Sequence, residues 1–345
     1  MTPASSPLRL RLDGEALGRN WRWLANRNPQ AACGAAIKAD GYGLGAVEAM
    51  MALANVGCRD FFVATWAEAM ELEVLGGLPV SVLHGVREDD MALAHTLRAR
   101  PVLNTVEQVK RWKRAKGGPC DVMVDTGMNR LGVSVEDVVA GLLDNLEIDT
   151  LMSHLACADE DSPMNARQRA YFAGLAGRTN AKRMSLANSA GIMLGANYAF
   201  DLVRPGIALY GGIPHPGMAG HIRPVVQPEV EVLQRRLVLA GQSVGYNAIW
   251  TAKHDTEVAI INLGYADGYW RGFSNKGSSS GGLFPVIGRV SMDLVALDVS
   301  AAASDVHEGD WLAVDYDLPT AAKQTGLSQY ELLTGLGHRF KRYWI

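Results

Sequence analysis

The sequence has few cysteines, and they form no pattern that binds a metal or builds a disulfide framework. The 345 residues include four cysteines, Cys33, Cys58, Cys120 and Cys157, with no C-x-x-C pair. Widely spaced cysteines of this kind predict reduced, mostly buried thiols. The pattern argues against a disulfide-rich secreted scaffold and a zinc ribbon, and it favours a cytoplasmic location.

An excess of one charge and a long hydrophobic run are missing as well. The formal net charge is −3 at pH 7, from 33 basic and 36 acidic residues. No run of lysine or arginine would attract nucleic acid or an anionic membrane surface. Residues 1–12 contain no signal-like apolar segment, and no stretch reaches the length of a transmembrane helix. We therefore expect neither a nucleic-acid partner nor a membrane partner.

The sequence does contain a regular alternation of short apolar runs and longer amphipathic segments over its first two thirds. Strands are predicted at 31–39, 61–65, 80–85, 100–104, 121–126, 150–155, 183–188 and 202–211, and helices at 46–56, 66–75, 89–98, 106–115, 135–143 and 165–176. Strands that alternate with helices are parallel, and this many favour a closed (β/α)₈ TIM-type barrel of the α/β class. In such a barrel, the active site is expected at the C-terminal ends of the strands.

The pattern changes after a proline-rich loop at residues 213–228. Beyond it, alternating segments predict half-buried strands at 230–235, 257–263, 284–290 and 294–299, with a short helix at 328–335. The segment 8–12 is a further candidate strand of this second sheet. We expect a barrel domain over residues 8–225 and a smaller, mainly β domain over residues 226–345.

Several predicted barrel strands end in residues that can carry chemistry. The first ends at Lys38, where burial would lower the pKa of the amine and make it nucleophilic toward an aldehyde. From this segment alone, a surface lysine in a strand-to-helix loop is the alternative. Later strands end near His154, near Asn188 and Ser189, and near Arg204. A helix N-terminus and backbone N–H groups at these late strands are where such barrels commonly hold a phosphate.

Longer motifs surround these strand ends and continue into the second domain. They are AAIKADGYGLG (35–45), VDTGMNRLG (124–132), SHLACADE (153–160), ANSA (187–190), DLVRPGIALYG (201–211), GYADG (264–268) and GRVSMD (288–293). In these motifs, which span nearly the whole chain, the sequence resembles the alanine racemase family, whose members are fold-type III pyridoxal 5'-phosphate (PLP) enzymes. The resemblance implies an isomerase that interconverts L- and D-alanine, for peptidoglycan or for alanine catabolism, and that acts as a homodimer on a small amino acid.

The resemblance also implies a role for individual residues. Lys38 would carry the cofactor covalently and act as the base on one face of the substrate Cα. His154 would lie against the cofactor ring, and Arg204 would bond to its pyridine nitrogen. Arg130 would orient the cofactor and the substrate carboxylate, while Met292 would reach the substrate from the second domain across the dimer interface. The phosphate would be held by Tyr42, Asn188, Ser189, Gly206, Ile207 and Tyr343.

Arg204 has a physical consequence for the reaction. Arginine keeps its proton at ordinary pH, so a ring nitrogen that faces it does not readily gain one. The cofactor is then a weaker electron sink, which suits reversible proton transfer. The alternatives are a structural ion pair for Arg204 and a satisfied polar core residue for His154.

The sequence departs from the family at the second base, a tyrosine in a segment resembling Y-G-x-x-Y-T-A. The segment here reads YNAIWTA over residues 246–252, and we align the catalytic position with Trp250, whose indole N–H only donates hydrogen bonds. Tyr246 could take the role, a water near Trp250 could relay the proton, or the second base could be lacking. In the last case the reaction would be that of a PLP-dependent lyase or aldolase, or a racemase of another small amino acid. We assign Tyr246 as the candidate second catalytic residue, with a packing or interface tyrosine as the alternative.

A second departure is Met123, where many members have a carbamylated lysine that braces the arginine matching Arg130. Methionine cannot form a carbamate, so a bound anion or a nearby polar side chain would have to hold Arg130. A non-catalytic PLP-binding protein is a further alternative. The second domain, with its SMD segment at 291–293, argues against it, because a carrier needs no substrate-facing domain.

Overall fold

The structure is a computed structural model that describes residues 6–345. The chain forms two compact units, one of residues 17–223 and the other of the residues up to 16 together with 224–345. We call them the barrel unit and the sheet unit. The division falls inside helix α1 (Gly14–Arg27), so the N-terminal strand belongs to the same unit as the C-terminal residues.

The barrel unit alternates strands and helices as the sequence predicts. Its strands are β2 (Ala32–Cys33), β3 (Ala35–Ala36), β4 (Phe61–Val63), β5 (Val80–Val82), β6 (Arg100–Leu103), β7 (Cys120–Met123), β8 (Ile148–Met152), β9 (Arg183–Ser185) and β10 (Leu202–Val203). Its helices are α1, α2 (Lys38–Gly43), α3 (Ala46–Asn55), α4 (Trp66–Leu72), α5 (Met91–Thr96), α6 (Val106–Arg114), α7 (Val135–Val139), α8 (Pro163–Ala173) and α9 (Ala196–Ala199).

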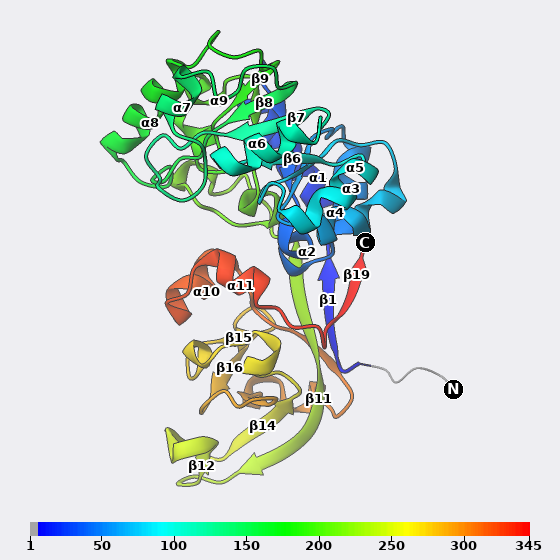
Figure 1. The fold of residues 1–345 in the computed structure, drawn as a ribbon. Helices are drawn as coiled ribbons and strands as arrows, with labels where there is room; N and C mark the ends of the chain where they lie inside the picture. Colours follow the sequence, from blue (N-terminus) through cyan, green and yellow to red (C-terminus); the bar gives the residue numbers. More distant parts are fainter. Residues whose placement is uncertain (1–5) are drawn as a thin grey trace. The chain divides into compact units, whose positions relative to one another are not determined.

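The strands of this unit close into a barrel. Strands β3 to β9 pair in sequence order, and β10 pairs in parallel with β2, which continues into β3 through Gly34. Backbone hydrogen bonds from Asp201 to Met184 (3.0 Å) and from Arg204 to Ala187 (2.9 Å) join the β10 segment to the β9 segment. Figure 1 shows strands β6 to β9 side by side, with helices around them. The predicted (β/α)₈ barrel is confirmed.

Burial and capping explain why these segments form these elements. The strands are mostly buried, as in β4, where all three residues are apolar, because side chains inside and helices outside both exclude water. Helix α4 begins with a capping box: Thr65 accepts a bond from the Glu68 N–H (3.2 Å), and the Glu68 carboxylate accepts one from the Thr65 N–H (3.2 Å). Ser134 and Asp137 form the same arrangement at the start of α7.

Several predicted elements differ from the structure, and the first strand, expected at 31–39, already ends at Ala36. The eighth strand was expected at 202–211 but ends at Val203, because Pro205 has no N–H to donate to a neighbouring strand. The apolar residues that follow form a buried 3₁₀ helix, Ile207–Tyr210, instead. Helix α1 was not predicted, although Leu17 and Leu24 are fully buried on one face of it.

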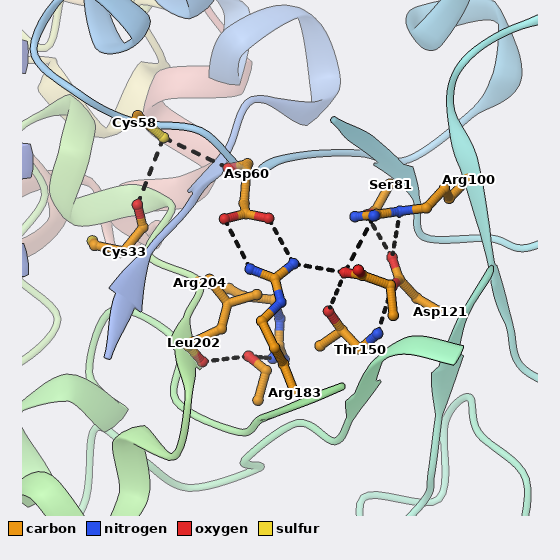
Figure 2. A network of polar contacts seen from close by, with 12 residues as sticks. Cys33, Cys58, Asp60, Ser81, Arg100, Asp121, Thr150, Arg183, Leu202 and Arg204 are labelled. Carbon is orange, nitrogen blue, oxygen red and sulfur yellow. Dashed lines mark hydrogen bonds and ion pairs between the residues drawn. The ribbon is translucent and has the colours of Figure 1, made fainter. Parts of the chain in front are cut away.

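At the N-terminal ends of the barrel strands lies a network of charged side chains, shown in Figure 2. Arg183 donates to both oxygens of Asp60 (2.8 and 3.1 Å) and to Asp149 (2.7 Å). Arg100 lies 3.2 Å from Asp149 and 3.8 Å from Asp121. These residues lie at or near the starts of strands β4, β6, β7, β8 and β9, so the parallel barrel brings them to one rim. We call this set of five residues the floor network.

The sheet unit is mainly β, as expected. Its strands are β1 (Leu8–Leu12), β11 (Val226–Val238), β12 (Ser243–Val244), β13 (Trp250–Thr251), β14 (Thr256–Ile261), β15 (Ser278–Ser279), β16 (Phe284–Ile287), β17 (Val295–Asp298), β18 (Trp311–Ala313) and β19 (Lys341–Trp344), and its helices are α10 (Leu318–Thr325) and α11 (Gln329–Thr334). Strand β1 lies between β11 and β19, with Leu10 opposite Pro228 and Arg342. The prediction that 8–12 joins this sheet is confirmed (Figure 1).

Over residues 6–345, no helix combines the length and the apolar character needed to cross a membrane. The same residues contain no group of three or more His, Cys, Asp or Glu side chains arranged to hold a metal ion. Cys33, Cys58, Cys120 and Cys157 are all free thiols.

Candidate active site

Lys38 stands directly after the first barrel strand, at the start of an unusual turn. The backbone of Ala39, Asp40, Gly41 and Tyr42 is left-handed, with φ between 51° and 60°. Three of these residues are not glycine, so the turn is strained, and strain of this kind gathers at functional sites. The Ala39 N–H donates to the Glu68 carboxylate (2.8 Å), and the Asp40 carboxylate accepts from the Ala46 N–H (2.8 Å), which holds the turn in place.

The surroundings of Lys38 disfavour its charged form. Burial lowers the pKa of its amine, and the positive charge of Arg130 lowers it further, while the Glu68 carboxylate acts in the opposite direction. In the described part of the chain Lys38 forms no ion pair. A larger fraction of the amine is therefore neutral at a given pH, which makes Lys38 a better nucleophile and a better base.

Tyr42, Ser189 and Gly206 form a compact cradle of hydrogen-bonding groups. Tyr42, in the turn after Lys38, is buried, and its ring stacks on Tyr210 with centroids 4.8 Å apart. A Cβ on Gly206 would lie 2.0 Å from the Tyr42 hydroxyl, so only glycine fits at that position. The Ser189 hydroxyl accepts a bond from the Gly206 N–H (2.9 Å), and both residues are buried. Hydroxyl and N–H groups that converge in this way suit an anion.

The Arg204 guanidinium is buried and is held by neutral acceptors. It donates to the Ser185 hydroxyl and to the Ser153 carbonyl (2.6 Å), and the Ser185 hydroxyl donates in turn to the Leu202 carbonyl. No carboxylate of the described residues forms an ion pair with Arg204. Burial lowers its pKa to about 10, and the more distant Asp121 carboxylate partly opposes that shift. Arg204 therefore stays protonated at neutral pH.

His154 lies among these cations and is neutral at physiological pH. Burial lowers its pKa to about 3, with further contributions from the charges of Arg204, Arg130 and Lys38. Its Nε2 lies 3.5 Å from the side-chain nitrogen of Asn188. A histidine that resists protonation is a poor acid, so its position suits packing against an aromatic ring better than proton transfer.

Arg130 stands on a loop that returns to strand β7. Gly132 fixes the return, because a Cβ there would lie 2.4 Å from the Asp125 nitrogen. The Arg130 side chain is exposed, and it makes no hydrogen bond or ion pair within residues 6–345. Met123 is buried in β7. The described residues therefore contain no polar side chain that braces Arg130.

Tyr246 and Trp250 lie in a hairpin of the sheet unit. Val244 of β12 pairs with Trp250 of β13, and the 3₁₀ turn Tyr246–Ala248 lies between these strands. Trp250 packs against a buried apolar cluster that includes Val258 and Ile287. Tyr246, at the tip of the hairpin, is 65% exposed. The hairpin therefore exposes the tyrosine and packs the partly buried tryptophan against the core.

The sheet unit also contains the two remaining residues of the predicted site. Met292 is 53% exposed and Tyr343 is 41% exposed. Tyr343 stands on β19 opposite Arg11 of β1, and the Lys341 ammonium lies 4.9 Å from the centre of its ring. Both side chains are thus available for contacts beyond their own sheet.

The residues of the barrel unit fit PLP by the chemistry of their donor groups. Lys38 offers a partly neutral amine to an aldehyde. The Tyr42 and Ser189 hydroxyls can donate to a phosphate, and the glycine at 206 lets the Tyr42 hydroxyl lie where a side chain would otherwise stand. Arg204 offers a protonated guanidinium to a ring nitrogen. The aldehyde, the phosphate and the ring nitrogen of the cofactor each have a matching partner here.

Sequence reasoning missed the residues that hold these groups in place. Glu68 fixes the turn after Lys38, and Ser185 accepts a bond from Arg204. Tyr210 stacks on Tyr42. A polar residue in a predicted strand, as Ser185 is in β9, was the one available signal, and the bond it makes depends on the three-dimensional fold.

A closed (β/α)₈ barrel with a desolvated lysine after its first strand, followed by a mainly β unit, defines the barrel class of PLP enzymes. The model of the alanine racemase N-terminal domain matches residues 12–214, and that of the C-terminal domain matches residues 225–344. The chain belongs to the alanine racemase family.

Individual relatives match over nearly their full length. An alanine racemase of Acidiphilium cryptum is 40% identical, covering 96% of this chain and 97% of the relative. A catabolic alanine racemase of Agrobacterium fabrum is 40% identical, over 97% and 92% respectively. The crystal structure of the Bartonella henselae alanine racemase with covalently bound PLP superposes with a TM-score of 0.90 at 33% identity, covering 99% of this chain and all of that one. The family is one of PLP-dependent isomerases.

Proposed function

We propose that this protein is a PLP-dependent racemase that interconverts L- and D-alanine. The observation that carries the proposal is the setting of Lys38, a desolvated amine near the Arg130 charge, after the first barrel strand. The alanine racemases among its relatives support the choice of substrate. The product would serve peptidoglycan synthesis or alanine catabolism.

Bound PLP supplies an electron sink that makes the Cα proton of an attached amino acid acidic. Lys38 would hold the cofactor and then take or return a proton at Nζ on one face of Cα. Arg204 would donate to the pyridine nitrogen, His154 would pack against the ring, and Arg130 would orient the substrate carboxylate. Tyr42, Asn188, Ser189, Gly206 and Ile207 would bind the phosphate, with Tyr343 as a further donor.

We propose Tyr246 as the second base, on the opposite face of Cα. Its side chain is exposed at the tip of a hairpin, whereas Trp250 packs on the core of the sheet unit. Tyr246 and Met292 would reach the active site of a partner subunit in a homodimer, the arrangement that the resemblance implies. A water relay near Trp250 is not needed if the tyrosine performs the proton transfer.

The cofactor half of the proposal is tested by Lys38→Ala, with Lys182→Ala, a surface lysine paired with Glu147, as the matched control. Borohydride reduction of the holoenzyme followed by peptide mass mapping should label Lys38 in the wild type and in the control. The Lys38→Ala variant should lose the label, the visible absorbance and at least about a thousandfold of the racemase rate. An unlabelled Lys38 in the wild type would overturn the proposal.

The racemase half is tested in deuterated water with Tyr246→Phe and Trp250→Phe. Tyr246→Phe removes the phenolic hydroxyl and Trp250→Phe removes the indole N–H, while both variants keep an aromatic ring. Tyr246→Phe should keep bound PLP and lose about 10²-fold to 10⁴-fold of the racemase rate, while Trp250→Phe keeps most of it. The opposite pattern would contradict the role of Tyr246. Release of an aldehyde, or inversion of an amino acid other than alanine, would support the lyase or the alternative racemase.

We further propose a homodimer in the cytoplasm, in which the boundary at residues 225 and 226 separates the barrel domain from the mainly β domain. Residues 8–16, assigned to the barrel domain from the sequence, belong to the sheet unit. The four free thiols support a reducing compartment. Sedimentation of the holoenzyme tests the dimer, and limited proteolysis near residues 225 and 226 tests the boundary.

A further inference from the structure

Arg339 joins two segments of the sheet unit that are far apart in the sequence. Its guanidinium donates to both oxygens of Asp267 (2.6 and 2.7 Å) and to one oxygen of Asp293 (2.7 Å). Asp267 is fully buried, while the side chains of Arg339 and Asp293 are about half exposed. Arg339 thus bonds to the buried carboxylate of Asp267 and to the half-exposed carboxylate of Asp293.

Asp267 belongs to the turn Tyr265–Asp267, and it organises that turn. Its carboxylate accepts a bond from the Gly264 N–H (3.0 Å) as well as the bonds from Arg339. The Gly337 N–H donates to its backbone carbonyl (3.1 Å). The buried carboxylate therefore has a full set of donors, and loss of the arginine would leave it with its charge largely unpaired.

Asp293 directly follows Met292, and the Met292 backbone is fixed by the same turn. The Ala266 N–H donates to the Met292 carbonyl (3.0 Å), and the Tyr265 N–H donates to the Ser291 carbonyl (3.1 Å). Gly264 lies so close that a Cβ there would be 2.1 Å from the Met292 carbonyl oxygen. The backbone at Met292 is held on one side by the turn and on the other by the bond from Arg339 to Asp293, while its side chain stays 53% exposed.

We propose that Arg339 is a positioning residue, which clamps the turn 264–268 to the segment 291–293 and so sets where Met292 meets the substrate. The inference rests on the proposed function, because that function places Met292 at the substrate. The Met292 side chain is 53% exposed, so packing within its own unit does not fix its position. Its position must therefore be set through its backbone. The clamp supplies that rigidity through two carboxylates.

Arg339→Gln and Asp293→Asn test the clamp in the holoenzyme. Arg339→Gln removes both ion pairs, whereas Asp293→Asn removes only the charge on the Met292 side and leaves the buried pair intact. We expect the KM for alanine to rise about tenfold in Arg339→Gln and about threefold in Asp293→Asn. The turnover number kcat should change less than about twofold in both, because neither residue touches the reacting atoms.

A readout independent of catalysis is amide hydrogen exchange followed by mass spectrometry. The N–H groups of Tyr265 and Ala266 should exchange about tenfold faster in Arg339→Gln, because the bonds they donate to the 291–293 segment open more often. Asp293→Asn should show a smaller increase. The second variant keeps the test decisive if Arg339→Gln does not fold.

Arg235→Gln is the matched control. Arg235 lies in the same unit and also donates to a carboxylate, Glu257 (2.9 Å), and to backbone carbonyls. Its loss should leave the KM and the exchange of Tyr265 and Ala266 unchanged.

The outcomes separate the inference from the function it rests on. If the wild type does not racemise alanine, the proposed function fails, while the exchange of the two amides still decides whether the clamp exists. Unchanged exchange in both clamp variants would overturn the inference. Faster exchange with an unchanged KM would overturn the positioning role.

Discussion

The two ends of the barrel differ in whether their charged side chains form ion pairs. In the floor network, at the N-terminal ends of the strands, arginines lie between carboxylates, as Figure 2 shows for Arg183 and Asp60. Arg183 also donates to Asp149 (2.7 Å). At the C-terminal ends, Lys38, Arg130 and Arg204 form no ion pair with any carboxylate of residues 6–345. Both ends are built from the same strands, so the difference in ion pairing comes from the side chains at each end and not from the fold.

The difference separates stability from function. Charges that are paired with one another are satisfied without a ligand, and removing one partner leaves the other buried and unpaired. Cations without carboxylate partners are left to interact with an anion or with a lone pair. The comparison therefore predicts that substitutions in the floor network affect folding, while those at the other end affect the cofactor.

The largest effect on folding is expected from Arg183→Met. This change leaves Asp60 without its bidentate partner and removes the nearest cation from Asp149, so the free energy of unfolding should fall by about 3–5 kcal/mol. Chemical denaturation of the cofactor-free protein measures it.

Arg204→Met is the contrast, since it removes a buried arginine whose acceptors are neutral. The cost of losing those bonds is offset by removal of a desolvated charge, so the free energy of unfolding should change by less than about 1 kcal/mol. Equal losses in the two variants would contradict the comparison. PLP affinity, measured by absorbance, should fall in Arg204→Met.

A smaller effect is expected from the pH dependence of stability at His154. Its pKa is about 3 when folded and 6.5 without the influence of the fold, so the unfolded chain binds a proton that the folded chain refuses. The stabilisation is present above pH 6.5 and is lost as the pH falls, by about 2 kcal/mol between pH 7 and pH 5. His154→Phe should remove this part of the slope in cofactor-free protein. If the wild type and the variant lose stability in parallel, His154 does not resist protonation.

The barrel could be predicted because its causes are local. Apolar runs such as 61–65 and amphipathic runs such as 106–115 each show the period of the element they form, and their alternation implies parallel strands. The rule that strand ends meet at one rim also predicted that Lys38, His154 and Arg204 belong near one another. In the structure the charges of Lys38 and Arg204 act on His154, while the roles of these residues stay predictions.

The rest depends on contacts that no local pattern encodes. Asp60 and Arg183 are 123 positions apart, and Arg339 and Asp267 are 72 apart. Such pairs form only once the strands are arranged, since a change in register would separate them. The left-handed turn after Lys38 was equally hidden, because alanine and aspartate rarely adopt that conformation, and bonds to Glu68 and Ala46 stabilise it.

The smallest expected effect distinguishes two carboxylates within the floor network. Burial raises the pKa of Asp121, against the charge of Arg100 and a bond from the Ser81 hydroxyl (2.6 Å). Burial also acts on Asp149, but the bond from Arg183 and the charge of Arg100 hold its pKa below the usual range. A raised carboxyl pKa means that the folded chain binds the proton first, so ionised Asp121 reduces stability as the pH rises, whereas Asp149 adds stability that is lost as the pH falls.

Asp121→Asn and Asp149→Asn should therefore change the pH dependence in opposite directions. Asp121→Asn should cost about 1 kcal/mol or less at pH 7, because the amide can still accept the Thr150 N–H bond (3.0 Å). In Asp121→Asn, the free energy of unfolding should also fall less steeply as the pH rises from 4 to 7. Asp149→Asn should cost more at pH 7 and should weaken the loss of stability on acidification. Thermal unfolding of both variants across that range checks the signs, and parallel curves would show that the two carboxylates share one environment.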